Sequence, residues 1–512
     1  MEPSVYLIDE SGCRQVSQPR GTYKDAEVCY VDQTLTFSQK TAGITAIRLV
    51  WSAAFDEDTL FLGDVWERGY SDMGWKKLEE TGKMPWYFLA YSQASGKTRG
   101  FGVRTQPNAL IYWTVSRDQV TMTADIRSGS RPALLNGRRL TVCQVVMSDF
   151  EGDSFEAASA FCSQMCDHPR LPKRPIYGGN DWYCNYGDSS YEKLAQLTKD
   201  IVEVSPKDPK PYVVVDDGWQ LCHHLTDKEE ESFNGGPWIE GNRNFGSMKK
   251  MADTISSLGA IPAIWFRPLF TVQKVSEDML LRHQGLKYTL DPSVPAVIDL
   301  VREDVRRFKD WGYQLIKHDF TSFDIIGKWG REQDAYLDDL PVFHDRTRTT
   351  AEIIKDLYAA IRQEAGEDTV IIGCNTMGHL AAGFFESQRT GDDTSGVEWS
   401  RTRDNGVNTM AFRMPQQGRF YLCDADCVGI TGKIDWKTNR KWLDLAAKSG
   451  TALFVSIGRG TMTDQMRADL KRAFAQAASN TQPSVPLDWL HQKTPCTWQS
   501  AFGTDTYNWN EE

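Results

Sequence analysis

The chain has 512 residues, of which 25% are charged and 11% are aromatic, and its formal net charge is −11. This charge, without a concentrated run of Lys and Arg, argues against binding to nucleic acid or to an anionic membrane. No stretch approaches the roughly 18 uninterrupted apolar residues of a membrane-spanning helix, and the chain does not begin with a signal region. We therefore expect a cytoplasmic protein as the sequence is written, or a periplasmic or secreted one if a signal peptide has been removed.

Cysteine and histidine usage predicts neither a disulfide framework nor a metal site. The 11 cysteines are an odd number spread over a long chain, which favours reduced thiols. His223 and His224 are adjacent, but no second histidine pair or Cys/His spacing completes a zinc set. We expect no metal and no cofactor, and the sequence leaves a homo-oligomer open.

Residues 1–165 have the pattern of an antiparallel β-sandwich. Short apolar runs at 110–113, 119–123 and 140–146 are separated by Gly, Ser, Asn and Asp. An amphipathic segment at 155–166 then leads into a connector with three prolines in the seven residues 169–175. We therefore place a sandwich domain at 1–165 and a linker at 166–175.

From residue 176, apolar runs of strand length alternate with segments of helical period, such as 295–311 and 350–361. Continuous apolar runs suit parallel strands that are buried on both faces. The candidate strands are 176–181, 212–216, 261–266, 313–318, 369–374, 383–388, 419–423 and 452–456. Eight strands close a (β/α)8 barrel. The sequence thus predicts an α/β catalytic barrel at 176–480, followed by a short β tail at 481–512.

Charged and polar residues follow several of these runs. The triplet Lys317-His318-Asp319 ends the fourth run, and Asp216, Asp217 and Asn375 end the second and fifth. The carboxyl ends of barrel strands form the active-site face, and a lysine beside a carboxylate is costly to desolvate there. We therefore favour a catalytic role for this edge over a set of surface turns.

Two carboxyl groups at this edge could cleave a glycosidic bond, which needs one group to protonate the leaving oxygen and another to attack or to activate water. Asp319 is the candidate nucleophile, held ionised by Lys317. Asp392 is the candidate acid/base, because Gly391 allows a sharp turn that presents its carboxyl, and Asp393 is its rival.

Other residues are candidates for substrate contact. Asp216 and Asp217 could accept hydrogen bonds from adjacent sugar hydroxyls, or they could form an acidic loop that caps the next helix. Tryptophans near the strand ends offer ring faces for a sugar, although each could also serve in packing. The predicted substrate-binding residues are Asp216, Asp217, Trp182, Trp219, Trp265, Arg267, Lys317, Asn375 and Arg389.

An ordered series of motifs carries a family resemblance over residues 175–460. These motifs are Asn180-Asp181-Trp182, Asp216-Asp217-Gly218-Trp219, Ile264-Trp265-Phe266-Arg267-Pro268, Leu290-Asp291-Pro292-Ser293, Lys317-His318-Asp319 and Arg389-Thr390-Gly391-Asp392. The set resembles glycoside hydrolase clan D, most of all family 36, the melibiase-type α-galactosidases. The resemblance implies that Asp319 is the nucleophile, that Lys317 contacts the sugar and that Asp216 and Asp217 hold galactose O4 and O6. It also implies that Asp392 is the acid/base.

The chain departs from the family pattern at three places. Residues 374–378 stand where family 36 has a cysteine and glycine-rich motif, so specificity at C2 is left open. The nucleophile motif reads Lys-His-Asp-Phe rather than Lys-Trp-Asp-Met, and the usual C-terminal β-domain is nearly absent.

The expected function is a retaining α-galactosidase that acts on an oligosaccharide or glycoside by double displacement. An α-N-acetylgalactosaminidase or an α-galactosyl transglycosidase would use the same site. From another class, a catalytically inactive glycan-binding barrel would keep the hydroxyl-binding acids but lose one catalytic carboxyl, and both candidates are present here.

Overall fold

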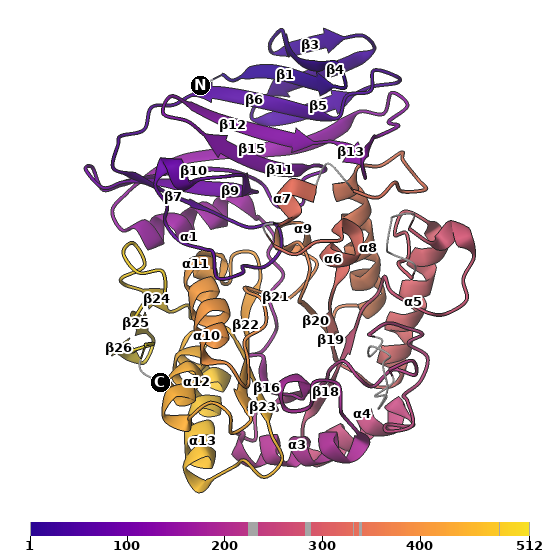
Figure 1. Cartoon of the computed structure of the whole chain (residues 1–512), viewed down its shortest axis with the longest axis vertical. Helices are drawn as coiled ribbons and strands as arrows, with labels where there is room; N and C mark the ends of the chain where they lie inside the picture. Colours follow the sequence, from indigo (N-terminus) through magenta and orange to yellow (C-terminus); the bar gives the residue numbers. More distant parts are fainter. Residues whose placement is uncertain are drawn as a thin grey trace.

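The computed structural model describes residues 2–223, 234–281, 288–330, 332–336, 340–480 and 482–510. Figure 1 shows a β-rich N-terminal part stacked on a barrel of strands and helices. His224 lies outside the described residues. Within them, no helix combines the length and the apolar character that crossing a membrane requires.

The N-terminal part is a sandwich of two antiparallel sheets, as predicted. One sheet has the order β2 (Gly12–Val16), β1 (Ser4–Asp9), β6 (Ala46–Ser52), β12 (Gln119–Asp125), β11 (Leu110–Val115) and β8 (Met84–Pro85). The other has the order β3 (Arg20–Tyr23), β4 (Ala26–Val31), β5 (Thr34–Ser38), β15 (Leu140–Glu151), β10 (Lys97–Val103), β9 (Tyr87–Ser92) and β7 (Thr59–Gly63). Alternate residues of β6, such as Ile47 and Leu49, are fully buried, which is the period of a half-buried strand.

Helix α1 (Ser154–Met165) closes the sandwich. Asp153 caps it by accepting hydrogen bonds from the backbone N–H groups of Phe155 and Glu156. The helix lies close to β10 because Gly100 leaves room for the ring of Phe161, which a Cβ would approach to 2.5 Å.

The second part is a closed barrel of parallel strands, which confirms the predicted (β/α)8 fold. Its strands are β16 (Tyr177–Asn180), β17 (Tyr212–Val215), β18 (Ile261–Phe266), β19 (Leu315–His318), β20 (Val370–Gly373), β21 (Ser387–Arg389), β22 (Leu422–Ile430) and β23 (Ala452–Ile457). Every residue of these strands is buried, which explains the continuous apolar runs of β17, β18, β20 and β23.

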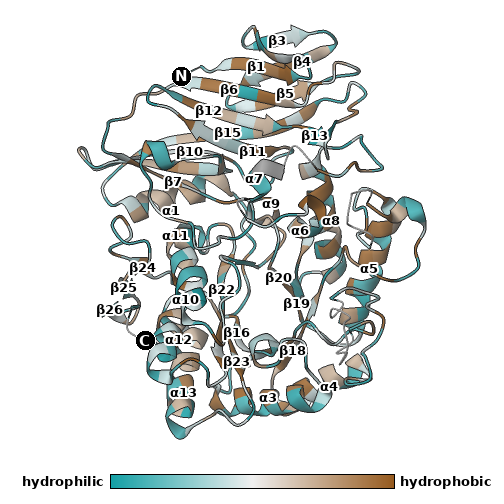
Figure 2. Ribbon diagram, viewed as in Figure 1, coloured by the Kyte–Doolittle hydropathy of each residue, from teal (hydrophilic) through white to brown (hydrophobic). Residues whose placement is uncertain are grey.

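Helices surround the barrel. The long ones are α3 (Tyr191–Val204), α4 (Met248–Leu258), α5 (Pro295–Asp310), α8 (Thr350–Ala365), α12 (Trp436–Lys448) and α13 (Asp464–Ser479). Shorter ones are α2 (Trp182–Asn185), α6 (Thr321–Ile326), α7 (Glu332–Tyr336), α9 (Gly378–Ala381), α10 (Trp399–Arg401) and α11 (Thr409–Arg413). The long helices carry both hydrophobic and hydrophilic colours in Figure 2, as expected for helices with one face on the barrel and one in solvent.

Two strand predictions were wrong in position. The sixth strand is β21 and not 383–388, because Gly383 has a φ of +88° and the N–H of Phe384 bonds to the carbonyl of Ala381, so the apolar run there forms a turn. The seventh is β22 and not 419–423. It continues through Asp424 and Asp426, beyond the predicted end at residue 423.

The C-terminal tail is a small antiparallel sheet of β24 (Val485–Pro486), β25 (Thr497–Ser500) and β26 (Gly503–Thr506). This agrees with the predicted short β segment. Trp489 of the tail packs against Trp75 and Phe155, with ring centroids 5.3 Å apart in both pairs, so the tail contacts the sandwich.

Replacing Gly178 tests how tightly the barrel is closed. Its φ is +150°, and a Cβ there would lie 1.9 Å from the carbonyl oxygen of Tyr212 on the next strand. Gly178→Ala should lower the free energy of unfolding by about 3 kcal/mol, measured by urea denaturation. Gly82→Ala is the matched control, because a Cβ there meets nothing within 4 Å. Equal stability of the two variants would contradict the packing described.

Candidate active site

A pocket of about 110 Å³ opens at the carboxyl ends of the barrel strands. It is lined by Arg68, Asn180, Trp182, Tyr183, Asp216, Asp217, Asn234, Trp265, Lys317, Asp319, Phe320, Asp393, Asp426 and Cys427. Six of the residues predicted as catalytic or substrate-binding are in this lining, together with Asp393. The strand ends therefore do converge, as the barrel fold requires.

Asp319 follows β19 and is held by three N–H donors. The indole N–H of Trp265 donates to Oδ2 at 3.0 Å, and the backbone N–H groups of Phe320 and Asn375 donate to Oδ1 at 2.7 and 3.1 Å. The bond from Phe320 accompanies an unusual φ of +64° at that residue, which turns the chain sharply out of the strand. The carboxylate is thus fixed in orientation and its negative charge is solvated by protein N–H groups.

Lys317 and Asp216 form a buried ion pair beside this carboxylate. The Lys317 Nζ atom lies 2.7 Å from Oδ2 of Asp216, which also accepts a hydrogen bond from Asn180 at 2.6 Å. Burial by itself would lower the pKa of Lys317, but the nearby carboxylates of Asp216 and Asp319 raise it well above its ordinary value. Lys317 is therefore a permanent cation in the pocket.

Two neighbouring carboxyls have raised pKa values. Burial raises the pKa of Asp217 from 3.8 to about 7, opposed by the hydrogen bond that Gln220 donates to it at 2.7 Å. Burial also raises the pKa of Asp181 to about 6, and Oδ1 of Asp181 accepts the backbone N–H of Asp216 at 2.8 Å. Asp217 in the pocket lining, and Asp181 behind it, can thus donate as well as accept hydrogen bonds near neutral pH.

The turn after β21 carries Asp392 and Asp393, and Asp393 is the one of the two that lines the pocket. Gly391 is needed here because a Cβ would lie 2.2 Å from Oγ1 of Thr409. Asp393 pairs with Arg389 at 3.2 Å and with Arg68 at 3.3 Å. Burial would raise the pKa of Asp393, but these arginines hold it below its usual range.

Asp426 reaches the pocket from an irregularity in β22. The register with β23 shifts between Asp424 and Cys427, and Asp426 has a φ of +73°. Its Oδ2 atom pairs with Arg389 at 3.0 Å and accepts the backbone N–H of Thr394 at 2.8 Å. Asp426 therefore anchors both the arginine and the chain that follows Asp393.

Four residues predicted to bind substrate lie behind the pocket wall. The indole of Trp219 is fully buried and donates to the carbonyl of Trp265 at 2.9 Å. Arg267 pairs with Asp324 and donates to Asn234, which lines the pocket, at 2.6 Å. Arg389 supports Asp393 through its side chain, whereas Asn375 donates its backbone N–H to Asp319 and its side-chain amide to Glu67. The structure thus places these four residues as supports.

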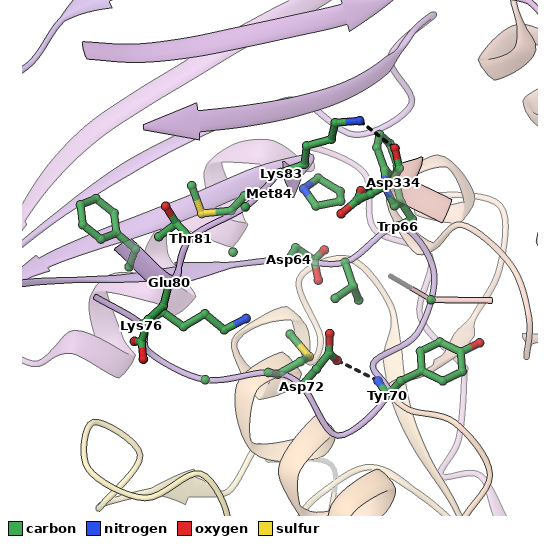
Figure 3. Close-up of a pocket in the computed structure, with 18 of the residues that line it drawn as sticks. Asp64, Trp66, Tyr70, Asp72, Lys76, Glu80, Thr81, Lys83, Met84 and Asp334 are labelled. Atoms are coloured by element: carbon green, nitrogen blue, oxygen red, sulfur yellow. Dashed lines mark hydrogen bonds between the residues drawn. The ribbon is translucent and has the colours of Figure 1, made fainter. Parts of the chain in front are cut away.

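Arg68 was not predicted from the sequence. It comes from residues 64–72 of the sandwich, far from the barrel motifs in sequence, and it lines a second cavity of about 220 Å³ as well as the pocket. Figure 3 shows this second cavity with Asp64, Trp66, Tyr70 and Asp72 of the same segment around it. A single arginine in a loop forms no sequence pattern that would indicate a role in the pocket.

Across the described residues, no three His, Cys, Asp or Glu side chains are grouped so that they could hold a metal ion. What the pocket does provide is carboxyls in different charge environments, fixed N–H donors and aromatic rings. These groups can bind hydroxyls and can transfer protons.

No family model matches the sequence. Solved structures with a similar fold include an α-galactosidase from Thermus thermophilus in complex with p-nitrophenyl α-D-galactopyranoside, at 17% identity and a TM-score of 0.63, covering 94% of this chain and 99% of that one. An α-galactosidase from Lactobacillus brevis has 14% identity and a TM-score of 0.62, and the match covers 98% of this chain and 77% of that one. A family 36 α-galactosidase from Geobacillus stearothermophilus in complex with raffinose has 13% identity and a TM-score of 0.60, and the match covers 95% of this chain and 77% of that one. The chain therefore shares its fold with solved α-galactosidases.

The raised pKa of Asp217 makes stability depend on pH. Its folded-state pKa of about 7 lies above the ordinary 3.8, so the folded chain binds more protons between these values. The free energy of unfolding of the wild type, relative to Asp217→Asn, should fall as pH rises from about 4 to 7. Urea denaturation across this range measures it, with Asp310→Asn, an exposed carboxyl, as control. Parallel curves for the wild type and Asp217→Asn would contradict the assignment.

Proposed function

We propose that the chain is a retaining α-glycoside hydrolase that releases terminal α-linked galactose. The observation that carries this proposal is that two carboxyls suited to the chemistry, Asp319 and Asp393, line one pocket with the hydroxyl-binding candidates Asp216, Asp217 and Lys317. The fold shared with solved α-galactosidases supports it. Because those identities are low, the choice of galactose rests on the sequence motifs and on the pocket.

In the first step, Asp319 attacks the anomeric carbon from the face opposite the leaving group. The three N–H donors around Asp319 fix the orientation of its carboxylate and restrict its motion. The glycosidic bond breaks as the second carboxyl gives its proton to the leaving oxygen. The product is a β-linked glycosyl ester of Asp319.

We assign the second carboxyl to Asp393 and not to Asp392, the first choice from sequence, because Asp393 lines the pocket. In the second step, Asp393 takes a proton from water, the water oxygen attacks the anomeric carbon, and Asp319 leaves as a carboxylate. The sugar is released with the α configuration retained.

Sugar hydroxyls would be held by the acids at the end of β17. Asp216 is positioned by Lys317 and Asn180, and Asp217 by Gln220. We carry galactose O4 and O6 over to Asp216 and Asp217 from the family motif. The rings of Trp182 and Trp265 in the pocket wall offer apolar faces to the C–H groups of the sugar.

Single substitutions to Asn test the three carboxyls. With 4-nitrophenyl α-galactoside, Asp319→Asn should lose activity by about 10⁴-fold or more, because no nucleophile remains. Asp393→Asn should lose about 10²- to 10⁴-fold on melibiose, whose leaving group needs a proton, and less on the nitrophenyl substrate. Asp392→Asn should lose less than Asp393→Asn. Thermal unfolding checks that each variant is folded.

The same assay includes the α-N-acetylgalactosaminide and α-glucoside analogues, and NMR identifies the first anomer released. Activity confined to one analogue would keep the mechanism and change the sugar, and transfer to an added sugar acceptor would make the chain a transglycosidase. The absence of turnover on all three substrates, with galactose still bound, would contradict the proposal and favour a binding-only barrel.

A further inference from the structure

A segment of the sandwich, residues 64–72, extends the end of a barrel strand. The backbone N–H of Gly69 donates to the carbonyl of Thr390 at 2.9 Å, and the N–H of Asp392 donates to the carbonyl of Gly69 at 2.8 Å. This parallel bridge lies directly beyond β21. The segment therefore fixes the backbone of the turn that carries Asp392 and Asp393.

Glu67 anchors this segment to the loops that follow β19, the strand that leads to Asp319, and β20. Its fully buried carboxyl accepts hydrogen bonds from the hydroxyl of Ser322 and the side-chain amide of Asn375, and from the N–H of Gly330 at 3.2 Å. Its backbone carbonyl accepts a hydrogen bond from Arg413 at 2.7 Å. A segment held at this many points cannot move independently of the barrel mouth.

The next residue, Arg68, places its guanidinium beside the carboxyls of Asp392 and Asp393. One terminal nitrogen lies 2.9 Å from Oδ1 of Asp392, and the other lies 3.3 Å from Oδ1 of Asp393. Its Nε donates to the hydroxyl of Tyr70 at 3.2 Å, and its guanidinium carbon lies 5.5 Å from the ring centre of Trp329. The side chain is almost completely buried, so the charge acts with little screening by solvent.

We propose that Arg68 is a positioning residue that the sandwich domain supplies to the barrel, where it orients Asp392 and Asp393 and balances their charge during catalysis. This inference rests on the proposed glycosidase function. It makes the first domain part of the catalytic machinery, because no barrel residue takes the place of Arg68 between the two carboxyls in the described structure.

Other charged and titratable groups face this pair. They are Arg389 from β21, Lys317 from β19, Arg401 from α10, Asp424 and Asp426 from β22, Tyr183 and Tyr186 near α2, Cys374 after β20, and Glu67 and Tyr70 beside Arg68. Arg389 is shared between Asp393 and Asp426, whereas Arg68 contacts Asp392 and Asp393 and neither Asp424 nor Asp426. Arg401 pairs with Asp392 alone and is largely exposed, so Arg68 is the buried cation whose ion pairs are confined to Asp392 and Asp393.

The charge has opposite effects on the two steps of the reaction. It favours the ionised form of the acid/base, which helps when that group must accept a proton from water. It opposes the protonated form that the first step requires. A neutral residue at position 68 should therefore raise the pKa of the acid/base and move the alkaline limb of the pH profile upward.

The test compares Arg68→Met and Arg68→Lys with the wild type, with Arg138→Met as a matched control. Arg138 also crosses from the sandwich to the barrel, where it pairs with Glu352 of α8 at 2.9 Å, but it does not line the pocket. The profile of kcat/KM against pH is recorded for melibiose and for 4-nitrophenyl α-galactoside, and thermal unfolding reports folding.

For Arg68→Met we expect the alkaline limb to move up by about one pH unit, with a larger loss of kcat on melibiose than on the nitrophenyl substrate. Arg68→Lys, which keeps a charge, should shift the limb less, and Arg138→Met should leave both limbs in place. If Arg68→Met fails to fold, the test is the ratio of kcat on melibiose to kcat on the nitrophenyl substrate in Arg68→Lys. A ratio unchanged from the wild type overturns the inference. If the wild type is active and the pH limbs of Arg68→Met are unchanged, this inference alone is overturned. If the wild type is inactive on every α-glycoside, the proposed function is overturned and this inference with it.

Discussion

The buried ion pair of Lys317 with Asp216 is the constraint on which the pocket depends. Both side chains lie inside the barrel mouth, and removing either partner would leave an uncompensated charge, which is strongly destabilising. The pair joins β19 to β17 and so fixes the distance between the end that bears Asp319 and the end that bears Asp217. Well-packed hydrophobic residues of similar volume are often as stable as a buried ion pair, or more so. The presence of the charges here is therefore better explained by chemistry at the pocket than by stability.

Much of the barrel could be predicted from the sequence because parallel strands buried on both faces are continuous apolar runs. That rule fails where a strand must present charge. In β22, Asp424 and Asp426 interrupt the apolar run, so the prediction ended at residue 423 although the strand continues to Ile430. The failure has a physical cause, since the shift in register that aims Asp426 at the pocket is also what disrupts the pattern. At residues 383–386 the rule fails in the other direction, because the apolar run there predicts a strand but forms a turn.

The residues of the candidate site likewise divide into those that the sequence predicts and those that it does not. Residues such as Asp319 and Lys317 could be recognised because each stands at the end of its own strand. Trp219 and Arg267 stand at similar places, but their side chains turn into the protein, and sequence position alone does not tell in which direction a side chain points. Arg68 carries no signal of this kind. Its contact with Asp392 joins positions more than 300 residues apart, so the relation appears only after both domains have folded.

The surface between the two domains is thus also the surface that shapes the pocket. Glu67 is bonded to the loops that follow β19 and β20, and Gly69 is bonded to the turn that follows β21. Burial raises the pKa of Glu67, and the donors around it oppose that rise, so the burial of its carboxyl between the domains depends on these hydrogen bonds. Loosening that contact would release Arg68 and free the turn of Asp393 in the same event. The stability of the interface and the position of the turn that carries Asp393 therefore depend on the same contacts.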